Sequence, residues 1–165
     1  MKLSLDVLEK MGACAEAKEY YTKRPVADPK EAITLLIEGC DELKEVTERK
    51  RLEWGSWLIV RLLSRKYAVK YAAFAAEQVI GLYEEKYPDD DRPKKAIEAA
   101  RSWLKGAGTA DAADAADAAY AAYAAYAARA AAYAAYAAYA ADAEYAKTLS
   151  AILKYGLTLL DKEAK

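Results

Sequence analysis

Residues 111–142 read DAADAADAAYAAYAAYAARAAAYAAYAAYAAD, and this stretch carries the strongest signal for the fold. Alanine is the best helix former, and here it fills every gap between the larger residues. No proline or glycine interrupts the run. The sequence therefore predicts a continuous α-helix over residues 110–143, with a bend expected near residues 130–132, where the spacing changes.

The larger residues of this run recur at every third position, with one step of four after Arg129. Each step of three falls about 60° short of a full helical turn, so the large side chains wind around the axis and form no single stripe. Tyrosine offers a large, rigid contact area, and the chain has 14 tyrosines but only one phenylalanine. We therefore expect two or more of these tyrosines to be exposed and to face a partner. The predicted partner-binding residues are Tyr120, Tyr123, Tyr126, Arg129, Tyr133, Tyr136 and Tyr139. The alternative is that the tyrosines fill gaps between closely packed helices.

Outside this run, apolar residues recur at intervals of three and four between a few prolines and glycines, which is the helical period. Asp28-Pro29 has the form of an N-cap followed by a proline in the first turn. The sequence predicts an all-α, single-domain bundle of about five to seven helices over residues 1–165, with a low-complexity Ala/Tyr/Asp helix at residues 108–146. The other expected helices cover residues 3–11, 13–23, 41–64, 67–86 and 91–105 and a segment that begins at Pro29.

The largest apolar groups on the amphipathic helices define a predicted core. This core consists of Trp54, Trp57, Leu58, Leu62, Ile97 and Trp103. The two cysteines, Cys14 and Cys40, form no short-spaced metal or redox pair. We expect both to be reduced, buried, small apolar residues, which predicts a reducing, cytoplasmic setting.

The charges nearly cancel, with 25 basic against 26 acidic residues. The chain therefore lacks the overall field that draws proteins to nucleic acid or to anionic membranes, and we expect neither partner. Its first residues alternate charged and apolar side chains, unlike a secretion signal. Arg129 lies in the middle of the longest charge-poor stretch, which argues against a membrane span there.

The sequence contains no histidine, so the commonest general base and the commonest metal ligand are both missing. Asp111, Asp114 and Asp117 diverge around the helix too much to hold one ion, and they favour a helix N-terminus instead. No glycine pattern resembles a phosphate-binding loop. We therefore predict a protein that is not an enzyme and that carries no cofactor or metal.

Three segments carry a resemblance to a known family. The first is Gly12-Ala13-Cys14 followed by Glu16-Ala17, and the second is the Trp54 and Trp57 segment that ends in Arg61-Leu62-Leu63. The third is Asp91-Arg92-Pro93, which leads into Ala96-Ile97-Glu98-Ala99-Ala100 and Trp103. With the alanine-rich tail, these segments resemble the alanine-rich immunity proteins of bacteria and phages.

The resemblance implies an inhibitor that binds a toxin or a defence protein and blocks it. In one version of this hypothesis, the inhibitor is encoded by a phage. It supplies no catalytic residue and no particular partner. One alternative is a module in which aromatic and alanine walls enclose a nucleotide-like small molecule. Another is a structural or oligomerising helical protein, and a homo-oligomer stays open under each of these interpretations.

Overall fold

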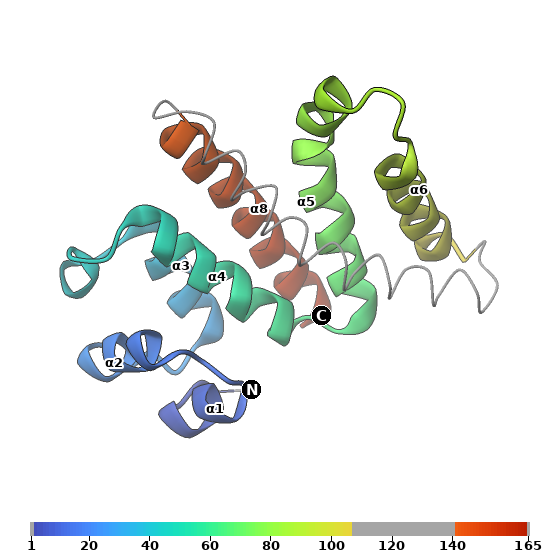
Figure 1. Cartoon of the computed structure of the whole chain (residues 1–165). Coiled ribbons are helices and arrows are strands. Elements are labelled where there is room, and N and C mark those ends of the chain that lie inside the picture. Colours follow the sequence, from blue (N-terminus) through green and yellow to red (C-terminus); the bar gives the residue numbers. More distant parts are fainter. Residues whose placement is uncertain (1, 107–140, 165) are drawn as a thin grey trace. The chain divides into compact units, whose positions relative to one another are not determined.

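The computed structural model describes residues 2–106 and 141–164, with the backbone alone for residues 141–144 (Figure 1). These residues form seven α-helices, one short 3-10 helix and no strand, which confirms the predicted all-α fold class. The elements are α1 (Leu5–Lys10), α2 (Ala15–Lys23), α3 (Pro29–Glu38), η1 (Asp41–Leu43), α4 (Glu48–Leu62), α5 (Arg65–Lys86), α6 (Arg92–Leu104) and α8 (Ala141–Glu163).

The chain divides into two compact units. Unit 1 is Met1–Leu62 together with Leu149–Lys165, and unit 2 is Leu63–Thr148. In unit 1, α1 packs against α2 and α3 packs against α4, while in unit 2 α5 packs against α6. That residues 1–165 form one domain stays a prediction.

The helix starts follow from capping residues that are visible in the sequence. Asp28 Oδ1 accepts a hydrogen bond from the Lys30 amide at 2.9 Å, and Pro29 occupies the first turn of α3, as predicted. Gly12 adopts a φ of 79°, in the left-handed region that glycine reaches without strain. It therefore ends the first helix at the point where the sequence predicted a break.

The predicted helix over residues 41–64 is wrong in its first part. Residues Asp41–Leu43 form the 3-10 helix η1, and α4 begins only at Glu48. The hydroxyl of Thr47 accepts a hydrogen bond from the amide of Lys50 at 3.3 Å, which is the contact of an N-cap residue. Periodicity alone misses this new start because the apolar pattern continues through η1 and beyond it, with the buried residues Leu43 and Val46.

Large aliphatic side chains fill the interior of unit 1. The most deeply buried ones come from α3, α4 and α8, and they are Ile33, Leu52, Ile59, Leu153 and Leu159. At Gly55, a Cβ atom would lie 3.1 Å from Cδ1 of Leu153, so α4 approaches this leucine closely where glycine leaves room. Lys30 of α3 pairs with Asp161 of α8 at 2.8 Å.

The predicted core is only partly correct. Of its six members, Leu58 is buried, and the others are only partly buried, although none is exposed. Indole rings are large, and their ring N–H needs a hydrogen-bond acceptor, so they are rarely fully buried in a small interior. They lie at its edge instead: Trp54 packs on Tyr20 at 5.7 Å between ring centroids, and Trp57 lies 4.1 Å below the guanidinium carbon of Arg61.

The prediction that both cysteines are buried is wrong. Cys14 is exposed, and its Sγ accepts a hydrogen bond from the Ala17 amide at 3.5 Å as the N-cap of α2. Cys40 is half-buried, and both thiols are free. A cysteine here takes the position that serine usually fills, because its sulfur is also a weak acceptor.

The predicted long helix over residues 110–143 falls mostly outside the described residues. Its last part, residues 141–143, belongs to α8 and is helical. None of the helices in the described ranges combines the length and the apolar character that a membrane crossing requires.

Candidate functional site

Small residues bring α5 and α6 together in unit 2. Val69 and Ala73 of α5 and Ala100 of α6 are buried against each other, and Trp103 and Leu104 pack on them. Alanine has no atoms beyond Cβ, so two helices that meet through it approach closely. This contact fixes α6 alongside α5 and so positions the connection between the two helices.

An ion pair also joins the same two helices. Nε and Nη2 of Arg101 donate to the two carboxylate oxygens of Glu77, so the pair is bidentate. A planar guanidinium matches a carboxylate in this geometry, which adds directional specificity to the attraction.

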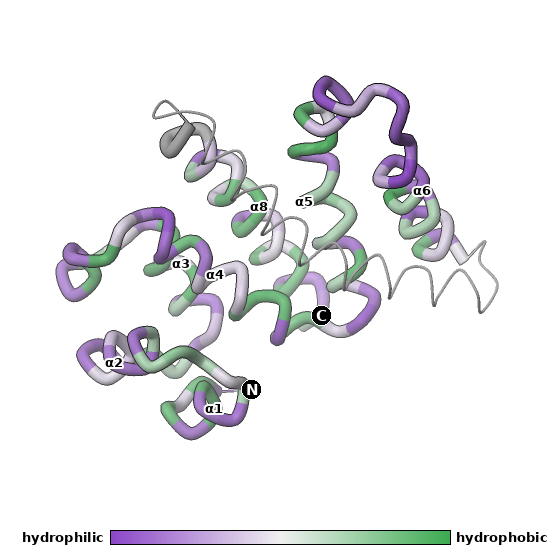
Figure 2. Tube along the Cα trace, viewed as in Figure 1, coloured by the Kyte–Doolittle hydropathy of each residue, from purple (hydrophilic) through white to green (hydrophobic). Residues whose placement is uncertain are grey.

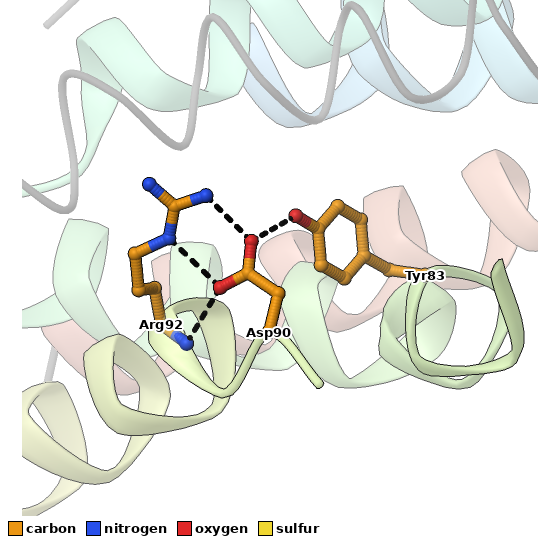
Figure 3. A network of polar contacts seen from close by, with 3 residues as sticks. All are labelled: Tyr83, Asp90 and Arg92. Carbon is orange, nitrogen blue, oxygen red and sulfur yellow. Dashed lines mark hydrogen bonds and ion pairs between the residues drawn. The ribbon is translucent and has the colours of Figure 1, made fainter. Parts of the chain in front are cut away.

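The connection between α5 and α6 is organised around the carboxylate of Asp90 (Figure 3). The Tyr83 hydroxyl donates to Oδ2 at 2.6 Å, and Nη2 of Arg92 donates to the same oxygen at 2.6 Å. The backbone amide and Nε of Arg92 donate to Oδ1 at 3.2 and 2.8 Å. Four donors therefore hold one carboxylate, and they link the end of α5 to the start of α6.

The electrostatics of this network follow from these contacts. The hydrogen bonds from Arg92, and next those from Tyr83, hold the pKa of Asp90 well below its usual range. Asp90 in turn raises the pKa of Arg92. Asp90 therefore stays ionised at neutral pH, and it serves as a fixed structural anion, since a general base needs a pKa near the working pH.

Around this network lies a surface that we call the α5–α6 corner, residues 82–92. It contains two of the three large apolar side chains that are exposed in the described residues, Leu82 at 63% and Tyr87 at 47%. The ring of Tyr87 packs on that of Tyr83 with 4.9 Å between centroids. Figure 2 shows an apolar segment near the end of α5 that is followed directly by a hydrophilic connection.

The corner is also acidic. Residues 82–92 contain five carboxylates and two basic side chains. Asp90 bonds to Arg92, and Asp91 pairs with Lys95 at 2.7 Å. Glu84, Glu85 and Asp89 are exposed, and none of them has an ion-pair partner in residues 2–106 or 145–164.

A second feature of unit 2 lies at the other end of the α5–α6 pair. A shallow, open pocket of about 390 Å³ is lined by Lys66, Trp103, Leu104, Lys105 and Gly106. The guanidinium carbon of Arg65 lies 5.8 Å from the centre of the Trp103 ring. The pocket therefore combines an indole face with positive charge.

The sequence-predicted partner residues Tyr120, Tyr123, Tyr126, Arg129, Tyr133, Tyr136 and Tyr139 all lie outside the described residues. The sequence predicted helices over residues 67–86 and 91–105 but no binding surface where they meet. The corner was therefore missed. The available signal was a leucine followed by Glu84 and Glu85, where the helical pattern leaves an apolar group on a charged face.

Among the residues that the structure describes, no group of three histidine, cysteine or carboxylate side chains could hold a metal ion. The groups that the corner brings together offer apolar contact, hydrogen bonds and negative charge. The fold and the corner thus define an all-helical protein with a surface suited to contact with another molecule.

The chain belongs to a family of immunity proteins, described as "Imm-5 like putative immunity protein", whose model matches residues 59–155. The resemblance inferred from the sequence is thereby confirmed. The match includes the Asp91-to-Trp103 segment that supported that inference, while the segment at residues 12–17 lies outside it. No curated protein and no solved structure matches the chain.

Proposed function

We propose that this protein binds a toxin and neutralises it by covering a surface that the toxin needs, without catalysing a reaction. The observation that carries the proposal is membership in the immunity family over residues 59–155. An immunity protein protects the cell that makes a toxin, so its partner is the toxin. In a variant of this proposal, the protein is carried by a phage and inhibits a defence protein of the host instead of a toxin.

The composition supports binding without turnover. The chain has no histidine to act as a general base near neutral pH. Two free cysteines are consistent with action in the reducing cytoplasm, where thiols stay reduced.

Protection of growth tests this function. The full tagged chain is expressed in its native host, captured proteins are identified, and each is then expressed alone and together with the chain. We expect one captured protein to stop growth when expressed alone, and growth to resume when the chain is present. If no captured protein is toxic, or if the chain relieves no toxicity, the proposed function is wrong.

The tyrosine-rich segment is a proposed part of the binding surface. Tyr120, Tyr123, Tyr126, Tyr133, Tyr136 and Tyr139, with Arg129, offer rigid aromatic contacts of the kind that dominate protein interfaces. Alanine at these tyrosines should abolish partner binding and leave the circular dichroism spectrum unchanged. Loss of folding would instead assign the tyrosines to the interior.

The pocket at Trp103 favours small-molecule binding as a second candidate function. An indole face beside Lys66 and Lys105 fits a flat anionic ligand such as a nucleotide. Purified protein would then carry absorbance near 260 nm or gain thermal stability with ATP as the probe. A Trp103→Ala variant should lose either signal.

A further inference from the structure

We propose that the α5–α6 corner is the surface that contacts the toxin, and that the toxin meets it with an apolar side chain surrounded by arginine and lysine. This inference rests on the proposed function and adds the location and the chemistry of the contact. It is carried by exposed apolar groups, by carboxylates that no helix requirement explains, and by a network that holds the corner in one conformation.

The exposed apolar groups are the first observation. Leu82 has 63% of its surface exposed and Tyr87 has 47%, and they lie five positions apart. A single exposed leucine needs no explanation, but two large apolar groups at one helix end form the kind of surface that partners bury. Tyr87 is held against the ring of Tyr83, so it loses little conformational freedom when it is covered.

The carboxylates beside these groups are the second observation. On a helix, residues three apart share a face, so Glu85 of α5 flanks Leu82. Tyr87 is the C-cap residue of α5, and Glu84 in the last turn of this helix is close to it in the chain. A partner that covers Leu82 and Tyr87 would bring basic side chains to these two glutamates.

The position of these glutamates in α5 separates them from structural charges. Negative charge is favoured at a helix N-terminus and disfavoured in the last turn, where the carbonyl groups point outward. Asp89, Asp90 and Asp91 precede α6 and are explained by this effect, but Glu84 and Glu85 occupy the last turn of α5. The last turn also carries Lys86, and the first turn carries Arg65 and Lys66 with no acidic residue, so the net charge at each end of this helix opposes its dipole. Such an arrangement does not stabilise the helix, and a basic partner would give the two glutamates a role.

The Asp90 network provides the third observation. Asp90 joins Tyr83 of α5 to Arg92 of α6 through hydrogen bonds of 2.6 to 3.2 Å (Figure 3). The connection is therefore fixed before any partner arrives, which lowers the entropy lost on binding.

The test uses the full chain and the toxin that it neutralises in the growth experiment. The apolar variant is Leu82→Ala, and the charge variant combines Glu84→Gln with Glu85→Gln. We expect the apolar variant to dissociate at least about tenfold faster. We expect the charge variant to associate several-fold more slowly, and its association rate to depend less on salt than that of the wild type.

Matched controls come from unit 1. Leu5→Ala removes the third exposed large apolar side chain, and Glu38→Gln with Glu45→Gln removes two exposed carboxylates. These variants have the same chemical changes and should bind and protect like the wild type. Circular dichroism and light scattering on every free variant report folding and oligomeric state.

The outcomes separate the two proposals. If the wild type neutralises the toxin and the corner variants bind and protect equally well, the corner is not the contact surface and the proposed function stands. If the corner variants change the oligomeric state of the free chain, the corner binds a second copy and the toxin contact is wrong. If the wild type neutralises no toxin, both proposals fail.

Discussion

The two units of this chain are held together in different ways. The side chains that unit 1 buries most deeply are leucines and isoleucines, including Ile33, Leu52 and Leu153. In the described part of unit 2, most buried residues are alanines, and an ion pair and a carboxylate network join α5 to α6. Buried apolar area contributes about 25 cal/mol per Å², so each large side chain of unit 1 contributes far more than an alanine. Unit 2 gains close helix contact and directional polar bonds instead.

The family match follows the same division. The matched residues 59–155 include all of unit 2, whereas most of unit 1 lies before them. The alanine-rich helices therefore belong to the part that defines the family. In the described part of this unit, the large apolar side chains Leu82 and Tyr87 are exposed, and they are available for a partner.

The largest expected effect on stability comes from a substitution that creates a cavity in unit 1. Leu153→Ala removes a side chain that has no exposed surface, and it should lower the free energy of unfolding by about 2–5 kcal/mol. Urea denaturation followed by tryptophan fluorescence measures this change. The exposed Leu5 is the control, and Leu5→Ala should change stability by no more than about 0.5 kcal/mol. Equal losses in the two variants would show that unit 1 does not depend on its aliphatic interior.

The converse change tests unit 2. Ala73→Leu adds bulk where α5 meets α6, and overpacking should cost about 1–3 kcal/mol in the same denaturation experiment. Ala151 lies exposed on α8, so Ala151→Leu is the matched control and should be nearly neutral. A neutral Ala73→Leu would mean that the helices are not in close contact.

Substitution of one glycine in each unit should change stability by a smaller amount. Gly81 lies in α5 with open space around it, so Gly81→Ala should raise the free energy of unfolding by about 1 kcal/mol through helix propensity. Gly55→Ala should fail to give this gain, because its Cβ would lie 3.1 Å from the buried Leu153. Thermal denaturation of both variants measures the difference. A similar gain at both positions would show that Leu153 can move aside.

The smallest expected effect is the pH dependence of the Asp90 network. The pKa of Asp90 is lower in the folded chain than its ordinary value of about 3.9, so ionised Asp90 stabilises the fold above that pH. This contribution is lost as the pH falls through the lower, folded-state pKa. The difference in Tm between wild type and Asp90→Asn should thus be constant from about pH 5 to 7 and shrink below about pH 4. Asp89→Asn, at an exposed neighbour, should show no such trend.

The sequence predicted the fold class and most helix boundaries because local signals determine them. Three local signals mark helix boundaries through backbone chemistry that needs no tertiary information. They are the Asp28-Pro29 cap of α3, Gly12 after α1 and Pro93 in the first turn of α6. The break before Glu48 was missed because a threonine cap inside an apolar pattern is a weak signal.

The interior and the site were harder to predict, for a tertiary reason. The predicted core contained three tryptophans, but the interior of unit 1 is made mainly of branched aliphatics, three of them on α8. The spacing of Ile152, Leu153 and Leu159 indicates one apolar face of this helix. The corner was missed because a local pattern does not show whether another helix covers Leu82.

The exposed position of Cys14 has a consequence for thiol chemistry. The thiolate is the reactive form of cysteine, so exposure and pKa set the rate of alkylation. Burial, and to a smaller extent a hydrogen bond with Glu42, raises the pKa of the Cys40 thiol. This thiol is also only partly accessible. A reagent such as iodoacetamide should therefore modify Cys14 first and Cys40 slowly. In a Cys14→Ser variant, the rate at which Cys40 is alkylated would report local opening of the segment between α3 and α4. One mass spectrum at each time point measures this rate.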